Sequence, residues 1–333
     1  MKHIVKLPSN ERAELFDIAA AKLKIPAGLI EKDFWVCYIL DILFRCSSYK
    51  NSLLFKGGTC LSKAFNLIER FSEDVDLALD WRLLGYTETE PWEERSNSAQ
   101  EKFKKDCINR TNNFLENDFI SELVSVIYND SGLNADVFLA DEEETILFRY
   151  PKEHTLAAIL GVIRLEIGPM AAWTPMVNTS ISCYLSKCID VDNNPDTIVR
   201  AVSPERTFWE KVTILHQEAN RSEDKRIPAR YSRHYYDVAK LCQTYVKKNA
   251  LKNIQLLQTV VIFKEKFYRT PWAKLPDAAT GSVRLVPYEY RIPELSKDYV
   301  LMQDMLFGNK PDFIDVLQEL SILEKEINEA SIH

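Results

Sequence analysis

The chain has 333 residues, of which 46% are hydrophobic and 27% charged, the balance of a globular protein with one large domain or two ordinary ones. A formal net charge of −7 excludes a polycation that would coat nucleic acid over its whole surface, so any such contact requires a local basic patch. No apolar run reaches the roughly 18 residues of a membrane span, and the first residues lack the apolar core of a signal peptide. We therefore expect a cytoplasmic protein without a membrane partner.

Cysteine and histidine usage limits the metal chemistry. The seven cysteines are odd in number and have no C-x-x-C spacing, which argues against a zinc site and against a disulfide framework. None of the five histidines forms a His-x-x-x-His pair. Carboxylates are therefore the expected ligands of any metal ion.

The N-terminal stretch predicts two helices, over 9–23 and 27–46, because apolar residues recur there at helical spacing. Glu31, Lys32 and Asp33 lie near the start of the second helix. Their simplest interpretation is a charged first turn that the helix dipole favours.

A Gly-Gly turn follows the first predicted strand. Residues 51–56 form a short apolar run that ends at Gly57 and Gly58, and the spacing of apolar residues then predicts a helix over 59–70. Gly57, Gly58 and Thr59 would then lie at a helix N-terminus, where unpaired N–H groups attract an anion and glycine lets a phosphate come close. Alone, such a turn is equally compatible with a simple tight turn.

Two aspartates follow on one face of a predicted strand. Residues 74–79 alternate with period two, so Asp74 and Asp76 point to one side while their apolar neighbours pack the other. Two adjacent carboxylates repel each other unless they are solvated or bind a cation, and Mg²⁺ prefers such oxygen ligands. The alternative is a surface strand with two solvated aspartates.

The middle of the chain predicts more strands. Residues 81–110 are polar and resemble an insertion or lid, and 111–128 have a helical pattern. Strands are expected over 135–139, 144–150, 158–167 and 178–186. In the third, Glu166 alternates with apolar residues, so it would be a third carboxylate on a polar face; the alternative is an edge-strand glutamate paired with Arg164.

From Val202 onward the pattern is helical. A helix begins at Ser203-Pro204-Glu205 and carries Lys211, and a later helix carries Asp237. Between them, residues 219–234 hold five Lys or Arg against two acids, which fits either phosphate binding or a solvated loop. The C-terminal part predicts further helices, the last over 311–329.

These residues resemble a known family. The run from Lys56 to Thr59, followed by Arg70-Phe71-Ser72-Glu73-Asp74-Val75-Asp76-Leu77, resembles the opening motif of DNA polymerase β-like nucleotidyltransferases, and more narrowly the AbiEii/AbiGii toxin family. The likeness extends over nearly the whole chain, through Glu31-Lys32-Asp33, the strand with Glu166, Glu210-Lys211, and Arg233-His234-Tyr235-Tyr236-Asp237. One departure is that many relatives have Arg-Asp where this chain has Arg233-His234.

The resemblance implies an α+β fold, with a polymerase β-like nucleotidyltransferase core whose small mixed sheet is flanked by helices. The core with its helical lead-in would span 1–200, and a mostly helical C-terminal domain over 201–333 would complete the active site.

The resemblance also implies roles for the residues. The nucleotide would be bound by Lys56, Gly57, Gly58, Thr59 and Ser72. Mg²⁺ would be bound by Asp74, Asp76 and Glu166, and Glu166 is alternatively the general base. Lys211 would neutralise phosphate charge, and Asp237 would orient Lys211 or the nucleotide. Two Mg²⁺ ions would stabilise the attacking and leaving oxygens of an in-line displacement at the α-phosphate of an NTP.

The expected function is transfer of a nucleoside monophosphate to an acceptor, with tRNA held by the basic loop 219–234. The chain would be the toxin of a toxin–antitoxin or abortive-infection system in phage defence, with a cognate antitoxin as partner. The alternatives are a small-molecule or protein acceptor, or a non-catalytic binding protein on the same fold.

Overall fold

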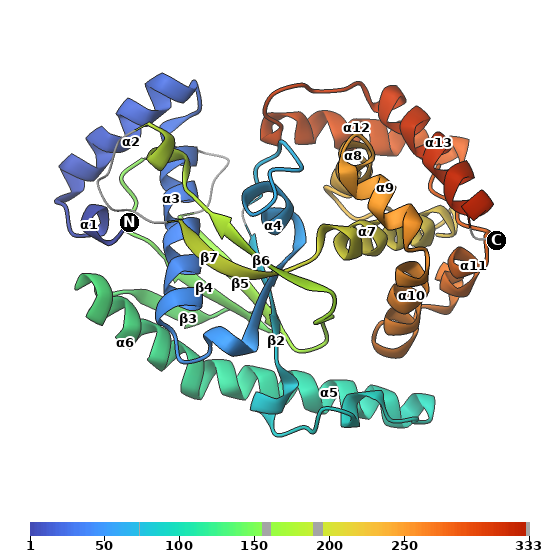
Figure 1. Cartoon of the computed structure of the whole chain (residues 1–333), viewed down its shortest axis with the longest axis horizontal. Helices are drawn as coiled ribbons and strands as arrows, with labels where there is room; N and C mark the ends of the chain where they lie inside the picture. Colours follow the sequence, from blue (N-terminus) through green and yellow to red (C-terminus); the bar gives the residue numbers. More distant parts are fainter. Residues whose placement is uncertain (73, 155–160, 189–195, 331–333) are drawn as a thin grey trace. The chain divides into compact units, whose positions relative to one another are not determined.

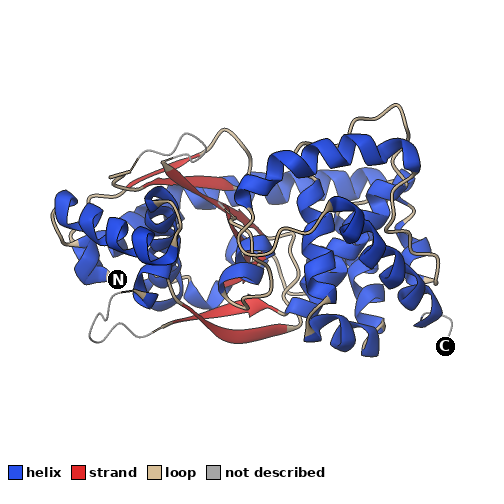
Figure 2. Cartoon of the chain, turned by 90° about the horizontal axis from the view of Figure 1, so that it is seen from above, coloured by secondary structure: helices blue, strands red, loops and turns tan. Residues whose placement is uncertain are grey.

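The computed structural model describes residues 1–72, 74–154, 161–188 and 196–330, which divide into two units. The first unit comprises Met1–Ala64 and Glu73–Ala201, and the second comprises Phe65–Ser72 and Val202–His333. Figure 2 shows the strands gathered in one part of the chain and helices throughout the other. Glu73 of the motif and residues 158–160 of the expected strand 158–167 lie outside the described residues.

A mixed sheet forms the centre of the first unit. Within the described residues it has seven strands in the order β3-β4-β5-β2-β1-β7-β6 (Figure 1). Their bounds are β1 (Leu53–Lys56), β2 (Asp74–Leu79), β3 (Asp136–Leu139), β4 (Thr145–Arg149), β5 (Val162–Gly168), β6 (Met176–Ile181) and β7 (Thr197–Val202). β2 pairs antiparallel with β1 and parallel with β5. The expected α+β fold with a mixed sheet is confirmed.

Helices flank the sheet within the first unit, and helices also build the second unit. Their bounds are α1 (Lys2–Val5), α2 (Ser9–Leu23), α3 (Ala27–Asp41), α4 (Gly57–Lys63), α5 (Asn97–Phe114), α6 (Ile120–Ser131), α7 (Pro204–Ala219), α8 (Ser232–Cys242), α9 (Tyr245–Lys252), α10 (Gln255–Phe267), α11 (Leu275–Ala279), α12 (Ile292–Met302) and α13 (Phe313–Ala330). α7 begins as expected, because the Ser203 side chain accepts a hydrogen bond from the Arg206 N–H and Pro204 occupies the first turn.

One face of the sheet is apolar and packs against α3. Val75, Leu77 and Leu165 on β2 and β5 are fully buried, and β5 alternates between buried and partly exposed residues along its whole length. The Trp35 ring of α3 lies 6.0 Å from the Phe148 ring of β4, edge to face. Because strand side chains alternate, the polar residues of β2 and β5 must lie on the opposite face.

Two expectations about secondary structure are wrong. The helix expected over 59–70 ends at Lys63, because residues 69–71 pair with the segment 305–307: the Phe71 N–H donates to the Met305 carbonyl at 2.8 Å, and the Phe307 N–H to the Glu69 carbonyl at 2.7 Å. β7 was not expected, because its exposed position 198 carries an apolar isoleucine, 62% exposed, so the sequence lacks the apolar–polar alternation that identifies a strand.

The charged triplet of α3 is not a first turn. α3 begins at Ala27, and Glu31, Lys32 and Asp33 are all buried. Asp33 forms an ion pair with Lys63 of α4 and accepts a hydrogen bond from the Tyr184 N–H at 2.6 Å. These are tertiary contacts that fix α4 to α3, so the helix dipole does not explain the triplet.

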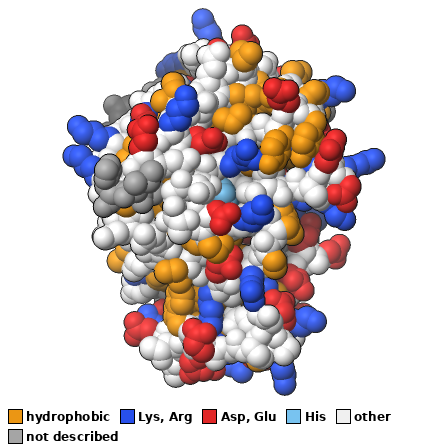
Figure 3. Space-filling model, turned by 90° about the vertical axis from the view of Figure 1, so that its right-hand side faces the viewer, with side chains coloured by type: hydrophobic (Ala, Val, Ile, Leu, Met, Phe, Trp, Pro, Cys, Tyr) orange, Lys and Arg blue, Asp and Glu red, His pale blue; other side chains and the backbone are white. Residues whose placement is uncertain are grey.

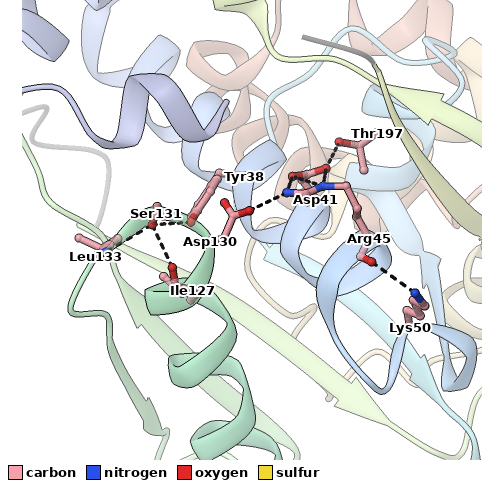
Figure 4. Close-up of polar contacts among 9 residues, drawn as sticks. All are labelled: Tyr38, Asp41, Arg45, Lys50, Ile127, Asp130, Ser131, Leu133 and Thr197. Atoms are coloured by element: carbon pink, nitrogen blue, oxygen red, sulfur yellow. Dashed lines mark hydrogen bonds and ion pairs between the residues drawn. The ribbon is translucent and has the colours of Figure 1, made fainter. Parts of the chain in front are cut away.

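The other end of α3 is held by a second polar network (Figure 4). Asp41 accepts hydrogen bonds from Arg45 and from the Thr197 hydroxyl of β7 at 2.8 Å, and Arg45 also pairs with Asp130 of α6 at 3.0 Å. Helix α3 is therefore tied to α4 through Asp33, and to β7 and α6 through the contacts of Asp41 and Arg45. No described helix has the length and apolar character needed to cross a membrane.

Candidate functional site

Three carboxylates lie together on the polar face of the sheet. Asp74 and Asp76 project from β2, and the parallel pairing with β5 places Glu166 directly beside Asp76 and Arg164 beside Asp74. Glu166 therefore lies beside the aspartate pair, and its role as a ligand stays a prediction. β5 lies between β4 and β2, so Glu166 is not on an edge strand, although it does lie 3.7 Å from Arg164 as that alternative expected. We call Asp74, Asp76 and Glu166 the carboxylate row.

The electrostatics of the carboxylate row favour a bound cation. Burial raises the pKa of Glu166, and the nearby carboxylates of Asp76 and Asp74 raise it further. Arg164 relieves part of this repulsion, because its Nε lies 3.5 Å from Asp74 Oδ1 and its Nη2 lies 3.7 Å from Glu166 Oε1. Three oxygen-donor side chains that repel one another are the ligand type that Mg²⁺ takes.

The side chains are not gathered as a preformed metal cage. Among the described residues, no three His, Cys, Asp or Glu side chains are close enough to hold a metal ion together. The chemistry of the row fits Mg²⁺, which usually binds through one or two carboxylates and substrate phosphates and keeps several waters. The residues therefore fit the ion as a partial ligand set that the substrate would complete.

The Gly-Gly turn packs directly on the carboxylate row. Gly57 has a φ of 79°, and a Cβ atom at this position would overlap the Asp76 carboxylate. The Thr59 hydroxyl donates to the Asp74 carbonyl oxygen, so its side chain holds β2 in place. Lys56 ends β1 opposite Asp76. The turn and the carboxylate row thus form one local structure. Position 57 requires glycine because of its positive φ and because the Asp76 carboxylate leaves no room for a Cβ atom.

Gly57→Ala should therefore be far more damaging than an ordinary glycine substitution. We expect a loss of about 1–3 kcal/mol of unfolding free energy, together with displacement of Asp76. Gly132→Ala is the matched control, because Gly132 has a similar φ of 76° but an added Cβ atom there would meet nothing within 4 Å. Urea unfolding gives the loss of unfolding free energy for each variant, and the difference between the two losses is the cost of the overlap with Asp76. Equal losses would mean that the contact with Asp76 carries no energy.

A second polar cluster lies in the second unit. Asp237 of α8 is fully buried and accepts hydrogen bonds from Arg70 Nε at 2.6 Å and Nη2 at 2.8 Å, while Lys211 Nζ of α7 lies 2.8 Å from its Oδ2. The two cations hold the pKa of Asp237 well below its usual range against the effect of burial. Burial lowers the pKa of Lys211, and Asp237 opposes that shift. We call Arg70, Lys211 and Asp237 the Asp237 cluster.

The residues expected to form one site thus belong to two units. Lys56, the Gly-Gly turn and the carboxylate row lie in the first unit; Ser72, Lys211 and Asp237 lie in the second. Sequence reasoning missed the role of Arg70, although it belongs to the quoted motif. It also missed Glu144, one of four consecutive acids from Asp141, which no sequence signal separates from the others.

The basic loop 219–234 is largely exposed. Its residues 220–231 connect α7 to α8, with Lys225, Arg226 and Arg230 exposed to solvent. Arg221 instead pairs with Glu218 at 2.6 Å, and the backbone N–H of Arg230 donates to Asp298 at 2.6 Å. The loop is anchored at the backbone while most of its cations remain accessible.

This chain is similar to one known protein family and to several solved structures. The family model described as "Nucleotidyl transferase AbiEii toxin, Type IV TA system" matches residues 41–319. Among solved structures, JHP933 from Helicobacter pylori is similar at 14% identity, covering 91% of this chain and 93% of that one, with a TM-score of 0.42. MenT4, a nucleotidyltransferase toxin from Mycobacterium tuberculosis H37Rv, is similar at 13% identity, covering 96% and 88%, with a TM-score of 0.43. The search of curated proteins found no match.

Proposed function

Since this chain belongs to the nucleotidyl transferase AbiEii toxin family of type IV toxin–antitoxin systems, we propose that it transfers a nucleoside monophosphate from an NTP to tRNA in a Mg²⁺-dependent reaction. The observation that carries the proposal is the register of β2 with β5, which brings Asp74, Asp76 and Glu166 together beside the Gly-Gly turn. A binding protein without catalytic function would have no need of three mutually repelling carboxylates.

The first unit supplies the reaction centre. The backbone at Gly57 and Gly58 binds the triphosphate, with Lys56 as a point cation beside it, and the carboxylate row binds the metal. Bound Mg²⁺ supplies charge neutralisation at the phosphate oxygens. Arg164 holds the side chains of Asp74 and Glu166 in position before substrate arrives.

The second unit supplies cationic groups. Asp237 pairs with Lys211 at 2.8 Å. This ion pair restricts the flexible Lys211 side chain and fixes the position of its ammonium group. Arg70 shares the same carboxylate, which leaves the Asp237 cluster with one net positive charge. That excess suits binding of a phosphate group, and Ser72 lies in the same connecting segment as Arg70.

The exposed cations of the loop 219–234 would bind the tRNA backbone. Figure 3 shows Lys and Arg side chains scattered among acidic and hydrophobic ones on the face in view, so binding would rely on local basic positions. A small-molecule or protein acceptor is the alternative that this mixed surface and the net charge of −7 favour.

Label transfer tests the proposal directly. The protein is incubated with Mg²⁺, each α-labelled NTP, and total tRNA or cell lysate. Label on tRNA is the expected result, and its absence from a reaction with EDTA confirms the metal requirement. Label found only on small molecules or on protein would assign the alternative acceptor, and no transfer from any NTP would overturn catalysis.

The toxin role has a separate test in cells. Induced expression of the wild-type chain should arrest bacterial growth, and co-expression of the cognate antitoxin, sought as the neighbouring gene, should restore it. Undiminished growth with the wild-type protein present at a measured level would contradict a toxic activity. The same strains challenged with phage would test a role in phage defence.

A further inference from the structure

Glu144 occupies a strained position next to the carboxylate row. It lies directly before β4 with a φ of 57°, the left-handed conformation that non-glycine residues rarely adopt and that costs about 1 kcal/mol or more. Two hydrogen bonds hold the Glu144 backbone in this conformation. Its N–H donates to Asn112 Oδ1 at 2.8 Å, and its carbonyl accepts from the Ile167 N–H at 2.8 Å. This conformation is therefore imposed by the surrounding structure.

The strained backbone directs one carboxylate oxygen of Glu144 into a place where no described residue bonds to it. Glu144 Oε1 is buried and finds no hydrogen-bond partner among the described residues. The carboxyl group lies over Gly168, where an added Cβ would be 3.4–3.5 Å from its carbon and both oxygens. Burial raises the pKa of Glu144 to about 7, the Glu143 charge adds to this, and Lys56 opposes it. A buried, unsatisfied oxygen on a strained backbone calls for a reason beyond folding.

The position of Glu144 relative to the row gives that reason. Gly168 follows Glu166 by two residues on β5, so it lies on the same face and about 6.6 Å further along the strand. Gly57 lies on the opposite side of Asp76, directly after the end of β1, which is the other neighbour of β2. Gly57 and Glu144 therefore flank the carboxylate row from opposite sides.

In-line phosphoryl transfer requires the attacking and leaving oxygens on opposite sides of the phosphorus. If the triphosphate binds at Gly57, the pyrophosphate leaves on that side and the acceptor approaches from the side of Glu144. We propose that Glu144 is an acceptor-binding residue whose carboxylate accepts a hydrogen bond from a hydroxyl group of the acceptor's terminal ribose. This inference rests on the proposed function. An RNA 3′ end carries adjacent 2′- and 3′-hydroxyls, so one can attack while Glu144 holds the other.

The first test separates acceptor binding from nucleotide binding and from folding. Glu144→Ala should raise the KM for total tRNA about tenfold or more, while the affinity for labelled NTP in the absence of tRNA stays unchanged. Its urea midpoint should equal or exceed that of the wild type, because an unpaired buried oxygen is removed. Asp141→Asn, which changes an exposed acid of the same run, should change none of these values. A loss of stability with an unchanged KM would assign Glu144 a structural role and overturn the proposal.

The second test addresses the hydroxyl itself. tRNA ending in 2′-deoxyadenosine should bind the wild-type protein at least several-fold more weakly than ordinary tRNA in an equilibrium filter-binding assay, whereas Glu144→Ala should bind both equally. Equal discrimination by the two proteins would overturn the inference. The assay needs no transfer, so it also separates the two proposals. If the wild type distinguishes the two tRNAs, Glu144→Ala does not, and no label transfer is seen, the binding role of Glu144 stands and the proposed reaction is refuted.

Discussion

Asp76→Asn is expected to reduce label transfer about a thousandfold or more while leaving the protein as stable as the wild type or more so. Asp76 is the centre of the carboxylate row, because it pairs in register with Glu166 and lies against Gly57. On the proposed function, loss of this carboxylate removes one of the proposed metal ligands, and a thousandfold effect corresponds to about 4 kcal/mol of transition-state stabilisation. The same change removes repulsion, since Asp76 raises the pKa of Glu166. Opposite effects on activity and stability are the mark of a functional site.

The measurement compares initial rates of transfer and urea midpoints for wild type, Asp76→Asn and Asp141→Asn. Asp141 is an exposed acid in the same unit, so its substitution makes the same change of charge away from the row. It should retain full activity. Transfer by Asp76→Asn above about a tenth of the wild-type rate would mean that the carboxylate row is not the reaction centre.

Part of this site could be predicted from local pattern alone. The alternation of residues 74–79 places Asp74 and Asp76 on one face, because the period of a strand is fixed by its geometry. The same rule predicts that Glu166 projects from a polar face. It cannot predict that β5 lies beside β2, because alternation determines which residues share a face and leaves the order of strands open. The proximity of Glu166 to Asp76 therefore needed the structure.

Other features were decided by contacts between distant segments. Residues 64–70 have helical spacing, yet backbone hydrogen bonds with residues 305–307 replace the helix there. Arg70 and Asp237 are separated by 167 positions, so no local pattern could assign one to the other. Glu144 is the extreme case. Its neighbours Glu142 and Glu143 are exposed acids of the same type, and only the clamped backbone turns Glu144 inward.

Asp237→Asn should be among the most destabilising single substitutions in the second unit. The Asp237 carboxylate is fully buried and is the shared partner of Arg70 and Lys211, so neutralising it removes the negative charge that both buried cations contact. Breaking a buried pair in this way typically costs about 3–5 kcal/mol. We expect a loss of that size in the free energy of urea unfolding at pH 7. Asp315→Asn, at an exposed position of α13, should be nearly neutral.

The pH dependence of this loss identifies its cause. The pKa of Asp237 in the folded state is lower than its unfolded value of about 3.9, so its contribution to stability is complete above pH 4 and disappears as the pH falls through the folded pKa. The difference between wild type and Asp237→Asn should therefore be constant from pH 5 to 7 and shrink at lower pH, as the wild-type carboxylate becomes protonated. A difference that stays the same down to the acid-unfolding limit would show that side-chain packing, and not the charge of Asp237, stabilises α7 and α8.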